Sequence, residues 1–315
     1  MRRVSLPDSD LQPAALCLGT GAFGTAVARE AAFRLLDRFA ELGGNFLDTA
    51  HIYAAWVPGG QGASERTLGA WMRSRGVRAQ TLIGSKGGHP AWGDAANAPR
   101  LAPEQIAQDL SESLDRLQTD YLDLYWLHRD DPSRPVGEII ETLATEQSAG
   151  RIHAFGCSNW TWERIAAAQE HARRHGLPGF VASQPEWNLA RRNPAAGGDA
   201  TMLALTPEDV RRHAETGLPC IPYSSQARGY FAGVESAGVL RTYDNAVSRG
   251  RRARAQDLAR RRGCQPGQIA LAYLLAHPFP VIPVIGTSNP AHLEAACAAT
   301  DIVLSPEDIH WLRDG

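Results

Sequence analysis

The sequence predicts an α/β fold, a (β/α)8 TIM barrel, built as a single domain over residues 1–315. Short apolar runs alternate with amphipathic helical patterns along the whole chain, which is typical of βαβ units and a parallel sheet. The apolar runs number eight, and 315 residues is an ordinary length for a closed barrel. No repeat or low-complexity linker interrupts the series, so we expect one domain.

Eight apolar runs are the expected strands, and several of them end in a polar residue or a glycine. Short apolar runs of this kind suit strands that are buried on both faces of a parallel sheet. In chain order they cover residues 15–20, 45–50, 81–86, 121–128, 152–158, 180–188, 219–225 and 281–286.

The segments between the strands carry helical patterns, and several have a clear start signal. Proline opens a first turn at Pro103 and Pro207, and an early acid follows Ser64 and both prolines. The longest connections follow the third, sixth and seventh strands, and in a barrel these gather at the face where ligands bind. The expected helices cover residues 30–42, 64–75, 103–117, 136–149, 161–175, 206–215 and 265–276.

The composition excludes several classes of protein. A formal net charge of −2 argues against a nucleic-acid partner. No apolar run approaches the length of a membrane span, and no secretory leader pattern opens the chain. The five cysteines are widely spaced without a Cys-x-x-Cys pair, which predicts reduced thiols, no metal site and a cytoplasmic location.

Arginine provides nearly all of the positive charge. Lysine and arginine total 32, and Lys86 is the one lysine, so 31 are arginines. Lys86 is either a chance exception or a position where a compact ammonium does what a guanidinium cannot. The arginine-rich segment 249–263 is either a basic patch or a solvated helix face, and the small net charge favours the solvated face.

Polar side chains converge at the ends of the second, third and fourth strands. Asp48, Lys86 and His128 stand at these ends, and Tyr53 follows Asp48 by five residues. Singly, each has a structural explanation: a capping carboxylate, a packed tyrosine or a hydrogen-bonded core histidine. A barrel brings all four to the rim where barrel enzymes keep their catalytic groups.

These four residues can carry out proton transfer to an oxygen. A phenol has an ordinary pKa of about 10, and a neighbouring ammonium is expected to lower it. Asp48 would hold Lys86 by an ion pair, and His128 would orient a carbonyl oxygen. The set would therefore protonate that oxygen as a hydride arrives at its carbon.

Ordered motifs resemble those of the aldo-keto reductase superfamily over essentially the whole chain. DTAHIY and GASERTLG come first, followed by SK, DLYWLHRDD, GRIHAFGCSNW, SQPEWN, PYSS and PVIGTSNPAHL. The resemblance implies a (β/α)8 fold, a nicotinamide cofactor and NAD(P)H-dependent reduction of an aldehyde or ketone, or the reverse reaction. It also implies a catalytic tetrad of Asp48, Tyr53, Lys86 and His128, with Tyr53 as the general acid/base.

The resemblance further implies contacts with the cofactor. Ser158, Asn159 and Gln184 are similar to the residues that anchor the carboxamide, and Tyr223 to the aromatic residue near the nicotinamide. Asn289 opens the loop and helix at the adenosine end. The other implied contacts are Gly21, Ser224, Ser225, Gly286, Thr287, Ser288 and His292.

The choice between NADP(H) and NAD(H) stays open at the level of the sequence. NADP(H) is the habit of the family that the chain resembles. The segment GTSNPAHLEAA, however, has no lysine or arginine for a 2′-phosphate, and His292 stands where an arginine is common.

Aromatic and cationic residues near the strand ends are the candidate substrate contacts. Indole faces combined with arginine hydrogen bonds suit a sugar- or polyol-derived carbonyl, although about half of such tryptophans pack in the core. The candidates are Trp56, Trp92, Arg129, Trp160, Trp187 and Arg228, with His89 beside them.

Two alternative functions accompany this interpretation. LGTGAFG, residues 18–24, has the Gly-x-Gly-x-x-Gly spacing of a Rossmann dehydrogenase, but eight ordered motifs outweigh this one pattern. A cofactor-binding regulatory or partner protein on the same barrel is the other alternative, and an intact tetrad argues for the enzyme. We expect a small carbonyl or alcohol as the partner, and neither nucleic acid nor membrane; the oligomeric state stays open.

Overall fold

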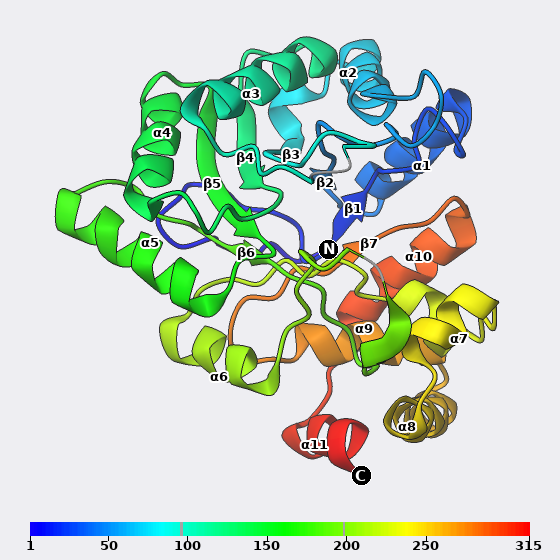
Figure 1. Ribbon diagram of the computed structural model, residues 1–315. Coiled ribbons are helices and arrows are strands. Elements are labelled where there is room, and N and C mark those ends of the chain that lie inside the picture. The colour runs from blue at the N-terminus through cyan, green and yellow to red at the C-terminus, as the bar shows by residue number, and fades with distance from the viewer. Residues whose placement is uncertain (95–96, 198) are drawn as a thin grey trace.

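The structure is a computed structural model that describes residues 1–94, 97–197 and 199–315. Seven parallel strands form one sheet in the order β6-β5-β4-β3-β2-β1-β7, and helices lie around it (Figure 1). The strands are β1 Cys17–Gly19, β2 Phe46–Asp48, β3 Leu82–Gly87, β4 Leu122–Leu127, β5 Ile152–Ser158, β6 Ser183–Gln184 and β7 Val284–Ile285.

The seventh expected strand, 219–225, closes the sheet between β6 and β7. Cys220 forms parallel bridges to Ser183 of β6 and to Val281, which precedes β7. The pairing is sparse because Pro219 and Pro222 have no N–H to donate. The predicted (β/α)8 barrel is confirmed, with the expected strand 219–225 reduced to isolated bridges.

Two of the expected strands are much shorter than predicted, and prolines explain both. β6 covers only two residues of the segment 180–188, since Pro185 follows Gln184 directly. β7 covers only two residues of 281–286, because Pro283 interrupts the pairing just before Val284.

Seven helices match the expected ones to within a residue or two at each end. The start signal of α6 works as the sequence indicates: Thr206 Oγ1 accepts the N–H of Asp209 at 3.1 Å, and the Asp209 carboxylate accepts the N–H of Thr206 at 2.9 Å. These helices are α1 Arg29–Glu41, α2 Ala63–Arg75, α3 Pro103–Leu117, α4 Val136–Ser148, α5 Trp162–His175, α6 Pro207–Thr216 and α9 Pro266–Leu275.

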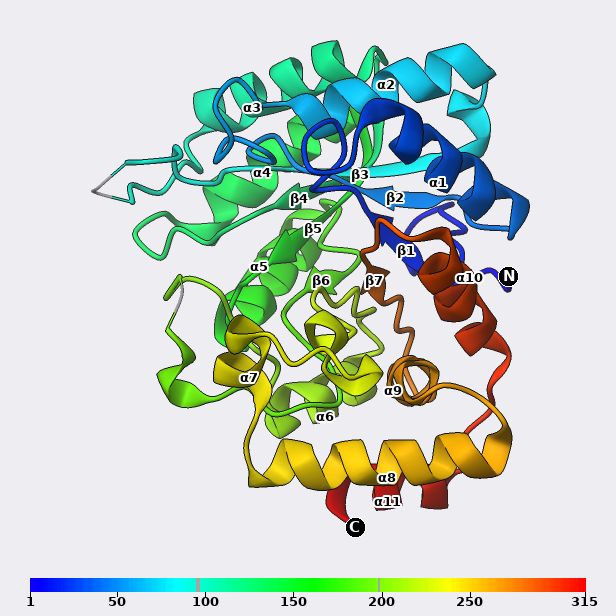
Figure 2. The ribbon, with the colours of Figure 1, turned by 90° about the vertical axis from the view of Figure 1, so that its right-hand side faces the viewer.

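Four further helices lie in the C-terminal part of the chain. α7 (Ala237–Tyr243) and α8 (Ala246–Arg262) are inserted between the expected strand 219–225 and α9, and α10 (Pro290–Ala298) follows β7. The C-terminal α11 (Pro306–Asp314) packs against α8, and Figure 2 shows the two side by side at the edge of the barrel. The sequence analysis missed α7 and α11 and identified only part of α8.

Apolar side chains fill the inside of the barrel and the layer between the sheet and the helices. Phe46, Leu124, Trp126, Ile221 and Ile282 form part of the inner cluster, and each is at most 2% exposed. No helix in the described parts of the chain is long and apolar enough to cross a membrane. The cysteines are all free thiols.

The glycines of LGTGAFG serve close packing in the barrel. Added Cβ atoms would lie 3.1 Å from the Val284 side chain at Gly19 and 2.5 Å from Thr67 Oγ1 at Gly24, which has a φ of +77°. Strand β1 pairs with β2 and β7, which differs from the strand order of a Rossmann sheet. The Rossmann alternative is therefore wrong, and the glycines belong to the first barrel turn.

Candidate active site

Four polar side chains meet at the C-terminal end of the barrel. Asp48 is the last residue of β2, Lys86 is the fifth residue of β3, and His128 directly follows β4. Tyr53 lies in the turn after β2. The fold therefore brings together the four residues that the sequence analysis selected, although they span 81 positions (128 − 48 + 1).

The ammonium of Lys86 is the centre of this group. Its Nζ donates to Asp48 Oδ2 at 2.5 Å, to the Thr49 carbonyl oxygen at 2.8 Å and to the Tyr53 hydroxyl at 2.9 Å. These bonds use all three protons of the ammonium, and the side chain is 2% exposed. A planar guanidinium cannot direct three donors from one nitrogen, which explains why the single lysine stands here.

Asp48 is held from a second direction. Its Oδ1 accepts a hydrogen bond from Gln184 Nε2 at 2.9 Å, so the carboxylate bridges β2 to β6 across the barrel mouth. Its Oδ2 also lies 3.5 Å from the Tyr53 hydroxyl. The ion pair is thus fixed in orientation, and Gln184 contributes to the tetrad in addition to the cofactor contact that the resemblance implied.

The environment of Tyr53 differs from the expectation. Burial raises the pKa of the phenol above its ordinary value of 10.0, and this effect outweighs the lowering by the Lys86 ammonium. The expected lowered pKa is therefore wrong in its net direction. Burial also lowers the pKa of Lys86, but Asp48 and Tyr53 together raise it above its ordinary value. The site holds a protonated phenol beside a charged ammonium at neutral pH.

His128 provides a neutral imidazole next to the phenol. Burial lowers its pKa well below the ordinary value, and the nearby cations Arg129 and Lys86 act in the same direction. Its ring meets the Tyr53 ring edge-on, with centroids 6.0 Å apart. Its Nδ1 is buried and has no hydrogen-bond partner among the described residues. A neutral imidazole in this position can orient an oxygen without adding charge.

A groove of about 500 Å³, here called the serine groove, lies next to Tyr53 at Gly21. A Cβ atom added at Gly21 would lie 3.5 Å from the Tyr53 ring, and one added at Gly286 would meet no atom within 4 Å. The groove wall therefore borders Tyr53 at Gly21 and leaves open space at Gly286. Six of the implied cofactor contacts line it: Gly21, Ser224, Ser225, Gly286, Thr287 and Ser288.

The implied carboxamide anchors lie together but are bonded mainly to one another. Asn159 Nδ2 donates to Ser158 Oγ at 3.0 Å, and Asn159 Oδ1 accepts from the Tyr223 hydroxyl at 2.7 Å and from the Leu203 N–H at 3.0 Å. Ser158 Oγ donates to the Gln184 carbonyl oxygen at 2.7 Å. A ligand amide that binds here must exchange with some of these bonds.

The adenosine end of the implied site has little positive charge. Thr287 Oγ1 accepts the N–H of Asn289 at 3.0 Å, and Asn289 Oδ1 accepts the N–H of Ala291 at 2.9 Å, which caps α10. His292 lies exposed on α10 and does not line the serine groove. The one cation on the groove is Arg228, a residue that the sequence analysis assigned to the substrate.

An aromatic wall stands on the other side of Tyr53. The Trp56 ring lies 6.2 Å from the Tyr53 ring, and the Trp92 ring lies 5.8 Å from Trp56. These two indoles are 46% and 59% exposed, the highest values among the aromatic side chains that the structure describes. The His89 ring lies 4.8 Å from His128. Trp56, Trp92 and His89 are thus the candidate substrate residues that the fold brings to the tetrad.

The other candidates have structural roles that the sequence analysis missed. Arg129 is buried, and its guanidinium donates to Asp199 at 2.8 Å and to the His128 carbonyl oxygen at 2.8 Å. Trp160 is buried against Phe180, with ring centroids 5.1 Å apart. Trp187 belongs to a separate core cluster around α8 and α9. These contacts give the three side chains structural roles, and their contact with a substrate stays a prediction.

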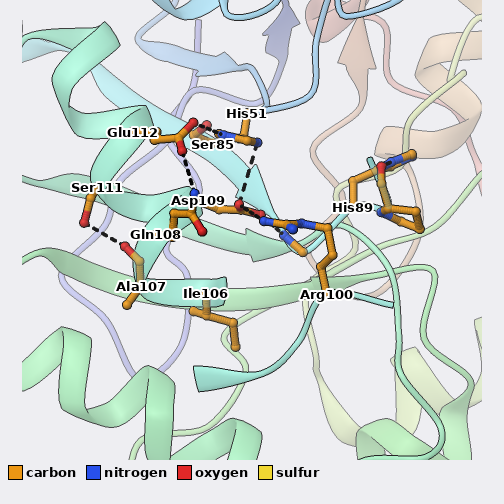
Figure 3. A network of polar contacts seen from close by, with 12 residues as sticks. His51, Ser85, His89, Arg100, Ile106, Ala107, Gln108, Asp109, Ser111 and Glu112 are labelled. Atoms are coloured by element: carbon orange, nitrogen blue, oxygen red, sulfur yellow. Dashed lines mark hydrogen bonds and ion pairs between the residues drawn. The ribbon is translucent and has the colours of Figure 1, made fainter. Parts of the chain in front are cut away.

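A buried polar network fixes the loop that carries His89 and Trp92. Asp109 of α3, 1% exposed, accepts the Gly88 N–H at 2.9 Å and the Arg100 guanidinium at 2.7 Å, at the two ends of this loop. Figure 3 shows Asp109 between Arg100 and His51, whose Nδ1 lies 3.9 Å from Asp109.

The same network reaches the loop that carries Tyr53. The ring nitrogen Nε2 of His51 lies 2.8 Å from Glu112, and the backbone N–H of His51 donates to the Lys86 carbonyl oxygen at 2.9 Å. Arg116 then joins Glu112 at 2.7 Å to the buried Glu65 at 3.3 Å. Sequence reasoning missed this network, because its residues come from four separate segments and form no local motif.

With this geometry described, comparisons with known proteins become informative. The model of the Aldo/keto reductase family matches residues 15–314. The chain belongs to the aldo/keto reductase family. It is 31% identical to the norsolorinic acid reductase stcV of Emericella nidulans, over 99% of this chain and 80% of that protein. It is 27% identical to an aryl-alcohol dehydrogenase of Pestalotiopsis microspora, over 99% and 81%.

The solved structures agree on the fold. The thermostable aldo-keto reductase Tm1743, solved in complex with the inhibitor epalrestat, superposes with a TM-score of 0.74 at 24% sequence identity, over 99% of both chains. The family resemblance stated from the sequence is confirmed, and the chain is an oxidoreductase of a family that generally uses NAD(P)H.

Proposed function

We propose that this aldo/keto reductase reduces an aldehyde or ketone to an alcohol with NAD(P)H, or runs the reverse reaction, and that Tyr53 is its general acid/base. The observation that carries the proposal is the contact of one buried ammonium with both Asp48 and the Tyr53 hydroxyl. A module that only bound a cofactor would gain nothing from a buried, charged lysine directed at a phenol, since burying that charge is costly.

Each residue has a proposed task in proton transfer. Tyr53 donates its proton to the substrate oxygen, and Lys86 stabilises the phenolate that remains, which offsets the cost of its burial. Asp48 holds Lys86, and His128 orients the oxygen through a hydrogen bond from a neutral ring. The nicotinamide, when bound, supplies the hydride, and residues of the serine groove, with Ser158, Asn159 and Gln184, would hold it.

The aromatic wall favours a flat carbonyl substrate. Trp56 and Trp92 offer exposed indole faces beside Tyr53, whereas Arg129 is already bonded to Asp199. This arrangement supports aromatic aldehydes and ketones over the sugar- or polyol-derived carbonyls that the sequence suggested, because a polyol needs free hydrogen-bonding groups. The name of the aryl-alcohol dehydrogenase relative agrees with this choice.

The choice of cofactor is also a proposal. NADP(H) is expected from the habit of the family, and NAD(H) competes because the serine groove has only Arg228 as a cation. A cytoplasmic location stays a prediction.

Two measurements test the proposal. NADPH and NADH are titrated by fluorescence into the native protein and Lys86→Met, and turnover is then measured on aryl aldehydes and on keto sugars. Binding to both proteins with turnover only by the native one supports the enzyme. Binding without turnover by the native protein supports the regulatory alternative. A higher kcat/KM for keto sugars would overturn the aromatic substrate class while leaving the reductase intact.

A further inference from the structure

A second groove lies away from the tetrad. It has a volume of about 1060 Å³, roughly twice that of the serine groove, and none of the four tetrad residues lines it. Its walls are the segment after β6, the first turn of α6, the side of α8 and the end of α11, and Figure 2 shows α8 beside α11. No part of the proposed reaction uses this groove.

The lining of this groove is strongly positive. Its charged residues are the carboxylates Glu186 and Asp314 and six guanidinium groups, so the formal balance is 6 − 2 = +4, whereas the whole chain carries −2. The arginines, which define the name arginine groove used below, are Arg191, Arg192, Arg211, Arg251, Arg254 and Arg313.

Both carboxylates of the groove are already bonded. Glu186 accepts from the Tyr243 hydroxyl at 2.6 Å and from Arg192 at 3.0 Å. Asp314 lies 2.7 Å from Arg313. Arg211 pairs with Glu208 beside the groove. Three of the six arginines are therefore neutralised by carboxylates of the protein, and the other three are not.

Three of the arginines have no carboxylate partner among the described residues. Arg251 donates to the carbonyl oxygens of Leu189 and Arg313, each at 3.0 Å, and Arg254 donates to the Leu312 carbonyl oxygen at 3.2 Å. The Arg191 side chain is exposed and makes no hydrogen bond or ion pair with any residue that the structure describes. Burial lowers the pKa of Arg251; Tyr273 and Asp314 raise it, and the charges of Arg254 and Arg191 lower it. A bound anion would offset the cost of burying this guanidinium.

A purely structural explanation accounts for only part of the cluster. Arg251 and Arg254 tie the C-terminal end of α11 to α8, which uses two or three of the five N–H donors that each guanidinium carries. Arg191 serves no such purpose.

We propose that the arginine groove binds a small polyanion, a molecule with two or more phosphate or carboxylate groups. Planar guanidinium groups bind such oxygens bidentately, and several of them around one groove favour multiple negative charges over one. The buried rings of Trp187 and Tyr273 also line the groove and can pack against an apolar part of the ligand.

The proposal revises the interpretation of the arginine-rich segment 249–263. Arg260 and Arg261 are exposed and pair with Asp257 at 3.2 and 3.0 Å, as a solvated helix face would. Arg251 and Arg254, one to three turns earlier, line the groove instead. The helix therefore has two faces of different character, and composition alone does not separate them.

Calorimetric titration of the full chain with inorganic triphosphate at low salt tests the proposal, and citrate replaces it in a second series to separate phosphate from carboxylate. We expect binding that weakens with added salt, and at least about a fivefold higher Kd in Arg191→Gln. Arg191 is exposed and unbonded, so this variant should fold normally. Arg260→Gln on the outer face of α8 is the matched control and should bind like the native chain.

A third variant identifies the groove that binds the probe. Arg228→Gln removes the cation of the serine groove, so a loss of binding in that variant alone would place triphosphate in the serine groove and overturn the proposal. The absence of binding heat at low salt, or equal losses in Arg191→Gln and Arg260→Gln, would overturn it as well. None of these measurements depends on catalysis, so the reductase proposal stands or falls separately.

Discussion

Replacing Asp109 by asparagine would release the loop that carries His89 and Trp92. Hydrogen bonds to a charged group contribute about 1.5–3 kcal/mol each. Asp109 makes two of them, to Gly88 at 2.9 Å and to Arg100 at 2.7 Å. Asparagine keeps an acceptor for one donor and turns an N–H group towards the other. Since the Arg100 side chain is 25% exposed and water compensates in part, we expect a loss of about 2 kcal/mol in unfolding free energy.

Asp123 of β4 provides a matched control, because it binds the start of β3, whereas Asp109 binds the loop that follows the end of β3. It accepts the Ile83 N–H at 2.8 Å and lies 2.9 Å from Arg78. Burial raises the pKa of Asp123, which means that the folded protein partly destabilises its charged carboxylate. Asp123→Asn should therefore cost stability of similar size or somewhat less, while the catalytic face stays intact.

Steady-state kinetics with an aryl aldehyde separates the two variants. We expect KM to rise about fivefold in Asp109→Asn, the equivalent of ~1 kcal/mol, with kcat within about twofold of the native value. Asp123→Asn should leave both parameters near native. Equal effects of the two variants on KM would show that general loosening of the barrel, rather than the anchored loop, sets substrate affinity, and the reasoning would be refuted.

The remaining predictions concern titration and cofactor choice. Because burial raises the pKa of Tyr53 above 10.0, the reductive kcat/KM should stay flat up to about pH 9 and fall only above it; a decline centred near pH 7 would contradict this. His292→Arg should raise the NADPH-to-NADH preference about tenfold, and an unchanged ratio would refute a phosphate contact there. Burial lowers the pKa of His213 below 6.5 in the folded protein. As the pH drops below about 6.5, His213 therefore takes up a proton more readily in the unfolded chain than in the folded one, and the free energy of unfolding should fall. Thermal melts at pH 5–8 would check this, and His213→Gln should flatten the slope.

Local rules were enough to predict the barrel and the placing of the tetrad. Parallel strands of one sheet end at the same edge, so Asp48, Lys86 and His128 had to approach one another once their strands were identified. Prolines made the predicted lengths of two strands wrong. The sequence predicts continuous strands over 180–188 and 281–286, but Pro185 and Pro283 reduce the paired length to two residues each.

Roles that depend on distant partners could not be predicted. Arg129 is bonded to a residue 70 positions away in the sequence, and the Asp109 anchor joins the two ends of a loop to α3. The pKa of Tyr53 is a similar case. The sequence placed an ammonium beside the phenol, but the amount of water excluded from both depends on the whole assembled barrel mouth.

The proline-interrupted strand 219–225 gives the barrel a preferred place to open. Around residue 220 the sheet is joined by a few hydrogen bonds, such as those from the Cys220 N–H to Pro280 and from the Ile282 N–H to Cys220, both 2.9 Å. Segments that are held by few such hydrogen bonds open locally, and their amide protons exchange with solvent before those of the rest of the fold. The serine groove spans this joint, with Ser224 and Ser225 on one side and Gly286 on the other. Any ligand that fills the groove therefore contacts both sides of this joint and stabilises the closed barrel. Its affinity is coupled to the equilibrium between the closed barrel and the locally unfolded one.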